Sequence, residues 1–370
     1  MKLVLDGRWM QQPMHGIGRY TLRLLQHLPA VLSPEDQVFV LYRATDFQPA
    51  DFEPVNLETA KFETANPEAF TWIEVKAPLF SLDGGEIARW LQRLHPDCVH
   101  FPGFWKTAPS PCPWVMTLHD LIHLRPPVKL QHRLYYRVLH KQLLKAQKVL
   151  TVSYDSAKKI SAWQPGLKDS ISVTYPGVDT VAHPLPLPDS HAAPYFFYVG
   201  NAKPHKNTDL LFVAMQQCLQ RLKHQQATPH LVMPHLVTVG LPQTDAPWHT
   251  ALTGISDTEL HQWYAHSLAV LLPSFEEGLG LPLLEAMAHK KPILASDIAV
   301  FREVLNGSGV CLNPREPSLW GRAMSAFFRE EDPFLLTIRQ SQRRIPVNRE
   351  RFQWEQMARD TYAVYQQATL

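Results

Sequence analysis

Residues 268–288 read Leu-Ala-Val-Leu-Leu-Pro-Ser-Phe-Glu-Glu-Gly-Leu-Gly-Leu-Pro-Leu-Leu-Glu-Ala-Met-Ala. The apolar run at 268–273 predicts a buried strand, and a glycine-containing turn follows it directly. A helix is expected to begin near Pro282, because proline is favoured in the first turn of a helix. A strand that leads through a glycine turn into a helix is the unit from which doubly wound α/β domains are built.

Short apolar runs alternate with helical patterns on both sides of this segment. In the first half of the chain the expected strands are 3–6, 38–42, 98–101, 114–119, 149–153 and 171–175. In the second half they are 195–200, 236–240, 268–273, 292–296 and 310–312. Apolar strands separated by helices are typical of parallel sheets that are covered on both faces. We therefore expect an α/β fold with two doubly wound parallel-sheet domains.

The stretch between the two strand series is rich in proline. Residues 176–194 read PGVDTVAHPLPLPDSHAAP, a composition that favours a semi-rigid linker. The alternative is one long surface loop inside a single domain, which the new strand at 195–200 makes less attractive.

Composition excludes several classes of protein. The 370 residues suffice for about two domains, and 45% hydrophobic with 19% charged residues excludes a mainly disordered chain. Lys and Arg (36) nearly balance Asp and Glu (34), which argues against a nucleic-acid binder. The four cysteines lack metal-like spacing, so free thiols in a reducing compartment are expected. The N-terminal apolar run is too short for a signal peptide, and no apolar stretch is long enough to span a membrane, so we expect a cytoplasmic protein.

The turn after the strand at 268–273 carries residues suited to binding an anion and a sugar. Its backbone N–H groups lie at a helix N-terminus, where negative charge is stabilised. Glu277 precedes the turn and Glu285 follows it on the helix, and carboxylates accept hydrogen bonds from hydroxyls. Lys203 and Lys206 follow the strand at 195–200, where two cations would neutralise a diphosphate. The alternatives are ordinary acidic capping and a solvated basic loop.

Two further sites in the first half follow strands. Gly16 and Gly18 let a backbone approach a phosphate closely and tolerate unusual φ angles, although a plain tight turn explains them too. His119 lies at the carboxyl end of a strand, where ligands bind in open α/β sheets. The alternative for His119 is a structural histidine.

Residues 129–148 form a candidate basic helix. They contain six Lys and Arg residues and no acid, and Arg133, Arg137, Lys141 and Lys145 repeat every four positions. Such a face suits an anionic membrane or a phosphorylated acceptor. A solvated helix face is the alternative.

Together these segments resemble the retaining, nucleotide-sugar-dependent glycosyltransferases of family 4, which have the GT-B fold. The matching segments appear in the family's order along nearly the whole chain: 15–20, 117–121, 175–179, 198–207, 252–265, 273–288 and 352–365. The resemblance implies two Rossmann-like domains facing a central cleft. It implies an acceptor-side domain of residues 1–178 plus 350–370, a linker of residues 179–194 and a nucleotide-sugar domain of residues 195–349.

The same resemblance implies roles for individual residues. The residues implied to be catalytic are His119, Lys206 and Glu277. The residues implied to bind the donor are Gly16, Gly18, Asn201, Lys203, Lys206, Ile255, Gly278, Leu279, Gly280, Leu281 and Glu285. Glu285 would bind the ribose hydroxyls and Glu277 a hydroxyl of the donor sugar. Asn201 stands where many relatives carry arginine, and we expect Lys203 to supply the missing charge.

The implied reaction moves a hexose, with mannose favoured, from a GDP- or UDP-linked sugar to a glycan or lipid-linked acceptor in surface polysaccharide assembly. No metal or other cofactor is expected, and the chain has no Asp-x-Asp triplet. A position on the inner face of the membrane is expected if the basic helix binds lipid. The alternatives are a GT-B-fold sugar-nucleotide epimerase and a non-catalytic nucleotide- or sugar-binding protein.

Overall fold

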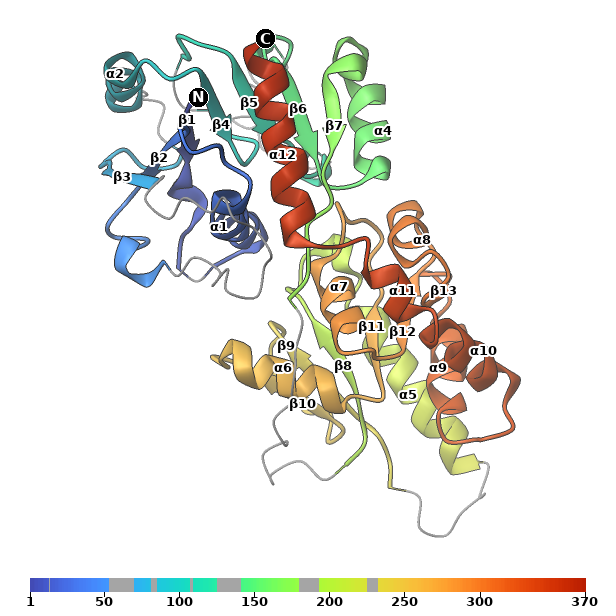
Figure 1. Ribbon diagram of the computed structural model, residues 1–370. Helices are drawn as coiled ribbons and strands as arrows, with labels where there is room; N and C mark the ends of the chain where they lie inside the picture. Colours follow the sequence, from blue (N-terminus) through green and yellow to red (C-terminus); the bar gives the residue numbers. More distant parts are fainter. Residues whose placement is uncertain are drawn as a thin grey trace. The chain divides into compact units, whose positions relative to one another are not determined.

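The computed structural model describes residues 1–12, 14–52, 70–80, 85–106, 109–124, 141–179, 193–224 and 232–370. The chain divides into two units. Unit 1 comprises Met1–Gly177 and Phe352–Leu370, and unit 2 comprises Val178–Arg351. Each unit carries one parallel sheet with helices around it, which confirms the predicted fold class (Figure 1). Most of the expected linker, residues 180–192, lies outside the described residues.

The sheet of unit 1 has the strand order β3-β2-β1-β4-β5-β6-β7, with every pair parallel. Its strands are β1 (Lys2–Asp6), β2 (Gln37–Tyr42), β3 (Phe70–Glu74), β4 (Cys98–Phe101), β5 (Trp114–Thr117), β6 (Lys148–Thr151) and β7 (Ile171–Val173). The sequence did not predict β3. This strand lies at the sheet edge and buries only Ile73, so it lacks the apolar run by which the central strands were found.

The helices of unit 1 come from both ends of the chain. They are α1 (Gly16–His27), α2 (Gly85–Leu94), α4 (Tyr154–Trp163) and the C-terminal α12 (Trp354–Thr369), with short 3-10 turns such as η1 (Gly7–Trp9) and η6 (Ile122–Leu124). The inner face of α12 packs against α1 and strands β4, β5 and β6. Tyr362 on α12 donates to Asp36 (2.5 Å), which also binds the terminal amine of Met1 (2.7 Å). The C-terminal helix is therefore fixed to the N-terminal segment by packing and by polar contacts.

The expected basic helix is described only at its end. Residues 129–140 lie outside the described residues, so Arg133 and Arg137 do as well. Within 141–148 the helix ends at Leu143, and Lys148 already belongs to β6. The prediction of a helix to residue 148 was therefore wrong at its end, because Leu143 and Ala146 are buried as the chain turns into the sheet.

The sheet of unit 2 has the order β10-β9-β8-β11-β12-β13, again wholly parallel. Its strands are β8 (Tyr195–Val199), β9 (His235–Val239), β10 (His249–Leu252), β11 (Ala269–Leu272), β12 (Ile293–Ser296) and β13 (Val310–Leu312). Its helices are α5 (Asp209–His224), α6 (Asp257–His266), α7 (Leu281–Ala288), α8 (Ala299–Leu305), α9 (Pro317–Ala326), α10 (Pro333–Gln342) and α11 (Ile345–Arg349). The sequence did not predict β10, an edge strand whose His249-Thr-Ala-Leu segment is too polar to be recognised as an apolar run.

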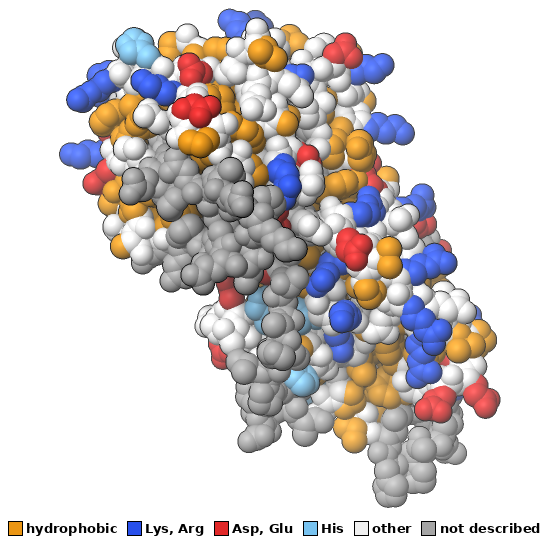
Figure 2. Space-filling view, viewed as in Figure 1, with side chains coloured by type: hydrophobic (Ala, Val, Ile, Leu, Met, Phe, Trp, Pro, Cys, Tyr) orange, Lys and Arg blue, Asp and Glu red, His pale blue; other side chains and the backbone are white. Residues whose placement is uncertain are grey.

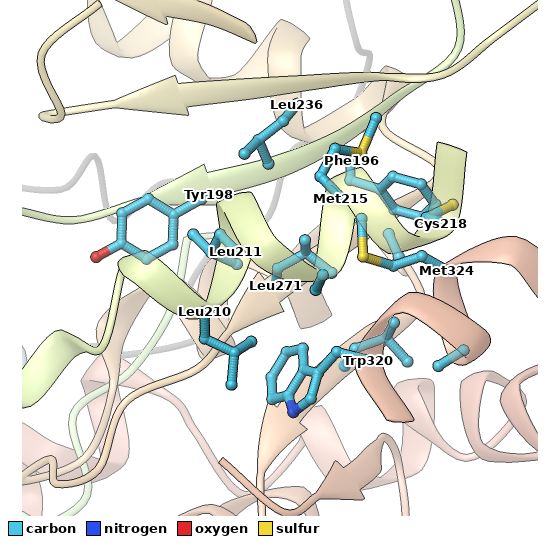
Figure 3. Close-up of a cluster of buried hydrophobic side chains, with 14 of the residues drawn as sticks. Phe196, Tyr198, Leu210, Leu211, Met215, Cys218, Leu236, Leu271, Trp320 and Met324 are labelled. Carbon is cyan, nitrogen blue, oxygen red and sulfur yellow. The ribbon is translucent and has the colours of Figure 1, made fainter. Parts of the chain in front are cut away.

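One face of this sheet is covered by α5 and α9. Trp320 of α9 is fully buried beside Leu210, Leu211 and Met324, and these side chains point toward one another in Figure 3. The indole N–H of Trp320 donates to the carbonyl of Asn313 (3.0 Å), so the buried ring leaves no polar atom without a partner. Burial of this size anchors α9 and gives the sheet a rigid base.

Each sheet reverses its strand order once near its centre. The reversal lies between β1 and β4 in unit 1 and between β8 and β11 in unit 2. In open α/β sheets, ligands bind at the carboxyl ends of the strands that flank such a reversal. In unit 1 these ends lead into Gly7 and Pro102, and in unit 2 they lead into Gly200 and Pro273. The sheet topology alone therefore identifies the loops that are expected to bind ligands.

Candidate functional site

The two loops at the reversal in unit 2 are joined to each other. The backbone N–H of Phe275 donates to the carbonyl of His205 (2.8 Å). The side-chain amide of Asn207 donates to the carbonyls of Pro273 (3.0 Å) and Pro314 (2.9 Å). Asn207 also has a left-handed backbone (φ 52°), which asparagine tolerates better than most residues. These hydrogen bonds therefore hold the loop after β8 and the loop after β11 together.

The central feature of these loops is an ion pair between Lys206 and Glu277. The Lys206 ammonium lies 2.6 Å from Glu277 Oε1, and the Ser274 hydroxyl donates to the same oxygen (2.7 Å). Glu277 is 8% exposed as a whole residue, whereas the side chain of Lys206 is 18% exposed. Two donors fix the orientation of the carboxylate, and the ammonium still reaches the surface. The pair thus brings a cation and an oriented acceptor to one place.

Helix α7 begins directly beside this pair. Gly280 has φ 97°, and a Cβ there would lie 2.8 Å from the ring of Phe301, so only glycine fits. In the described residues no side chain caps the start of α7, and its first turn holds no acid. Gly278, Leu279 and Leu281 supply the remaining backbone of this turn. An N-terminus with no side-chain cap and no acid in its first turn favours an anion.

Glu285 lies one turn into α7 and contacts α6. The hydroxyl of Tyr264 donates to Glu285 Oε2 (2.7 Å), and Tyr264 is fully buried. Helix α6 starts with a capping box formed by Ser256 and Glu259, directly after Ile255. Sequence reasoning did not single out Tyr264. Its only signal was a place within the matching segment 252–265.

The other two residues expected in the first loop are more exposed. Asn201 accepts a hydrogen bond from the backbone N–H of Lys203 through its side-chain oxygen (3.2 Å). Tyr198 donates to the carbonyl of Asn201 (3.2 Å), and the pKa of Tyr198 is raised, first by burial and then by the nearby Glu277. Lys203 makes no ion pair with any residue that the structure describes. The two lysines therefore differ, because Lys206 is held by a carboxylate and Lys203 is solvated.

In unit 1, His119 follows β5 and is held by backbone and ring contacts. Its Nε2 lies 2.9 Å from the carbonyl of Pro102, so this nitrogen carries the proton and donates. The ring of Tyr20 meets the imidazole edge-on, with centroids 4.8 Å apart. Burial lowers the pKa of His119, although the Pro102 carbonyl and Asp120 oppose that shift. A neutral imidazole that donates through Nε2 keeps Nδ1 as an acceptor, which suits a hydroxyl.

A buried polar layer lies next to His119. Nδ1 of His100 lies 2.7 Å from the Tyr365 hydroxyl, and Nε2 lies 2.8 Å from Thr117 Oγ1. Tyr20 reaches the same Thr117 hydroxyl at 3.4 Å. Burial, with a smaller contribution from His119, lowers the pKa of His100 to about 3, so this ring is neutral. The layer ties α12 and α1 to strands β4 and β5.

Gly16 and Gly18 lie in the first turn of α1 rather than in a glycine-rich loop or a tight turn. Neither has a left-handed φ angle, so neither position uses the freedom of glycine to adopt one. Gly16 is exposed, whereas a Cβ on Gly18 would lie 2.6 Å from the carbonyl oxygen of Trp9. Gly18 is therefore required for the close packing of α1 on η1, whereas Gly16 lies exposed at the start of α1.

The described residues hold neither a metal-binding cluster nor a membrane-spanning helix. No cluster of three or more His, Cys, Asp or Glu side chains in the described ranges has a metal-binding arrangement. No helix in the same ranges combines the length and hydropathy needed to cross a bilayer. On the face drawn in Figure 2, Lys and Arg side chains are interspersed with Asp and Glu on each unit, as the formal net charge of +2 leads one to expect.

The chain is similar to known proteins in sequence and in fold. An O-antigen chain mannosyltransferase of Salmonella typhimurium is 30% identical over 213 residues, which is 56% of this chain and 59% of that relative. An O-antigen chain mannosyltransferase of Escherichia coli is 26% identical and covers 85% of this chain and 87% of its own length. The Anabaena protein HepE, crystallised with UDP and glucose, has a similar fold, with a TM-score of 0.64 and 16% identity over 98% of each chain.

Family matches cover most of the chain and both units. Residues 14–182 match the family described as Glycosyltransferase Family 4. Residues 193–330 match the family described as Glycosyl transferases group 1. The two matches follow each other in the order of the two sheets, as expected from the resemblance of the motifs. The chain belongs to the group 1 glycosyltransferases of family 4.

Proposed function

We propose that this protein transfers a hexose, with mannose preferred, from a nucleoside diphosphate-sugar to a glycan or lipid-linked acceptor during assembly of a surface polysaccharide. The observation that carries the proposal is the Lys206–Glu277 pair beside the uncapped start of α7. The preference for mannose and for polysaccharide rests on the names of the two O-antigen relatives.

In this proposal unit 2 binds the donor. Lys206, Lys203 and the backbone of Gly278–Leu281 stabilise the negative charge of the departing diphosphate, which develops in the transition state. Glu277 accepts a hydrogen bond from a hydroxyl of the donor sugar, and Glu285 accepts from the ribose. The contact between Lys206 and Glu277 supports this assignment, because it holds the cation next to the acceptor of the sugar hydroxyl.

Unit 1 supplies the acceptor side. His119 is a neutral imidazole whose Nε2 is occupied by the Pro102 carbonyl, so its Nδ1 accepts from a sugar hydroxyl. The bond from the anomeric carbon to the acceptor oxygen forms as the bond to the leaving phosphate breaks. The acceptor proton goes to that phosphate oxygen, and the anomeric configuration is retained. Lys206 and the α7 N-terminus take the place of a metal ion in this scheme.

The choice of base and the membrane contact complete the proposal. HepE was crystallised with UDP, whereas the two O-antigen relatives are mannosyltransferases, so GDP- and UDP-linked sugars are both candidates. Peripheral contact with anionic lipid is proposed through residues 129–148. Lys141 and Lys145, the exposed basic residues at the described end of that segment, support it.

The test is a transfer assay with GDP-mannose, UDP-glucose and UDP-galactose, each with EDTA, against acceptors extracted from a polysaccharide-deficient strain. We expect one sugar nucleotide to label a glycan or lipid-linked product, and proton NMR of that product to show the donor's anomeric configuration. An inverted product would contradict the retaining mechanism. Interconversion of a sugar nucleotide without acceptor would instead identify an epimerase.

A further inference from the structure

Three rings, those of Tyr264, His289 and His261, form a chain of contacts that leads to Glu285. The Tyr264 hydroxyl donates to Glu285 Oε2 (2.7 Å), and the ring of His289 lies parallel to the Tyr264 ring, at an interplanar angle of 6° and a centroid distance of 5.5 Å. His289 Nε2 in turn lies 2.9 Å from His261 Nδ1. Tyr264 and His261 belong to α6, and His289 is the residue that ends α7.

We propose that Tyr264 and His289 are positioning residues that orient the Glu285 carboxylate toward the ribose hydroxyls of the donor nucleotide, with His261 securing the His289 ring. The proposal rests on the proposed function, because it requires unit 2 to bind a nucleotide through Glu285. It adds to that function the residues that set the preference for a ribose.

The need for a positioning group follows from the place of Glu285. Its side chain is long and only half-buried, so a carboxylate in that position has several rotamers to choose from. Binding two neighbouring hydroxyls requires a defined direction of both carboxylate oxygens. Tyr264 is fully buried and approaches Oε2 from the protein side, so its hydroxyl selects one orientation.

The two histidines hold Tyr264 in turn. An N···N hydrogen bond needs one ring to donate and the other to accept, so the pair is never doubly protonated while the bond persists. Burial, with the nearby His261 and Lys291, lowers the pKa of His289 to about 4, so this ring is neutral at physiological pH. Lys291 is itself engaged, since its ammonium donates to the carbonyl of Ala265 on α6 (3.1 Å). The neutral His289 ring, held by its hydrogen bond to His261, therefore stacks on the Tyr264 ring in a fixed orientation.

The experiment compares nucleotides that differ only in the ribose hydroxyls. Dissociation constants are measured by calorimetry for UDP, GDP, ADP and CDP, and then for the 2′,3′-dideoxy form of the best binder. The ratio of the two constants reports the ribose contact, and a general loss of folding lowers both affinities without changing the ratio. The variants are Tyr264→Phe, His289→Ala and His289→Phe, with thermal unfolding as the check on folding.

Tyr195→Phe is the matched control. Tyr195 is also a buried tyrosine whose hydroxyl contacts α6, but it donates to a backbone carbonyl, that of Trp263 (2.8 Å). We expect the wild-type protein to prefer the ribonucleotide by about 10- to 100-fold, because hydrogen bonds to a charged group are strong. Tyr264→Phe should reduce this ratio by about 5- to 20-fold and His289→Ala by about 3-fold. His289→Phe keeps an aromatic ring stacked on Tyr264, so it should reduce the ratio less than His289→Ala does. Tyr195→Phe should keep the wild-type ratio.

A wild-type ratio in Tyr264→Phe, with the nucleotide still bound, overturns the inference and leaves the proposed function standing. An equal fall in Tyr195→Phe overturns it too, because the effect would then belong to the packing of α6. Failure of the wild-type protein to bind any of the four diphosphates overturns the proposed function, and this inference with it.

Discussion

The two sheet reversals share a topology and differ in their electrostatics. In unit 2 the loops after β8 and β11 carry an ion pair, Lys206 with Glu277, beside an uncapped helix start. In unit 1 the corresponding edge carries a neutral His119 beside a buried layer of His100, Thr117 and hydroxyl groups. The difference follows the two ligands expected, because a diphosphate needs cations and a sugar hydroxyl needs neutral acceptors and donors.

The two edges also differ in how the chain assembles them. Lys206 and Glu277 are 71 positions apart and lie on loops that follow neighbouring strands. His100 and Tyr365 are 265 positions apart, so the polar layer of unit 1 forms only when the C-terminal helix has docked. Substitutions at Lys206 or Glu277 should therefore lower the rate of catalysis, whereas substitutions at His100 or Tyr365 should lower the free energy of unfolding.

The largest effect is expected for Lys206→Ala. Removing the cation that we propose to face the leaving diphosphate should lower kcat by about 10²–10³-fold, the range known for a lost transition-state donor. Steady-state transfer kinetics measure it, and the acceptor KM should change much less. Lys203→Ala is the matched control on the same loop, and should cost less than about 10-fold, since Lys203 is solvated. Equal losses in the two variants would break the distinction between the lysines.

A smaller effect, on stability, is expected for His100→Ala. The change leaves the Tyr365 hydroxyl and Thr117 without their buried partner and opens a cavity, so the free energy of unfolding should fall by about 2–4 kcal/mol. Urea unfolding measures it. Tyr365→Phe should cost about 1–2 kcal/mol, and the double variant should cost less than the sum, because both changes remove the same bond. Full additivity would mean that the layer does not act as a unit.

Gly18→Ala tests the close packing of α1 in unit 1. The new Cβ would lie 2.6 Å from the Trp9 carbonyl oxygen, so the helix must shift at a cost of about 1–3 kcal/mol. Gly16→Ala, two residues earlier and exposed, should be neutral or slightly stabilising, because alanine favours the helix. Thermal unfolding of both variants measures the difference, and an unperturbed Gly18→Ala would contradict the packing described for η1.

The smallest effect concerns the pH dependence of stability. His100 stays neutral in the folded protein to about pH 3, whereas a histidine in the unfolded chain takes a proton below about pH 6.5. The unfolded state therefore binds more protons between these values, and stability falls as the pH falls. His100→Gln should make that fall shallower by about 1 kcal/mol per pH unit between pH 6 and 4. His224→Gln, at the exposed end of α5, should leave the slope unchanged, and urea midpoints across this range decide it.

The central strands were predictable from sequence because both of their faces are buried. Phe196, Phe197, Val270 and Leu271 are all fully buried, and such runs are visible without a partner. Of the four edge strands, β7 and β13 were predicted from short apolar runs, whereas β3 and β10 were missed because polar residues interrupt their sequences.

The candidate site divides in the same way. Glu277, Glu285 and Lys206 stand in local patterns that the sequence displays, whereas the contact of Tyr264 with Glu285 depends on how α6 packs against α7. The helical backbone of Gly18 was misjudged because the Trp9 carbonyl that it must avoid belongs to another element. Local patterns thus locate the groups, and tertiary packing decides what each one touches.

We propose that unit 2 binds a nucleoside diphosphate through its loops and the α7 N-terminus. The decisive measurement is calorimetric titration of UDP, GDP and dTDP in EDTA into the wild-type protein and Lys206→Ala. One diphosphate should bind the wild-type protein, and Lys206→Ala should weaken that binding without changing the affinity for the corresponding nucleoside. Binding of none of the three diphosphates, or an unchanged affinity in Lys206→Ala, would contradict it.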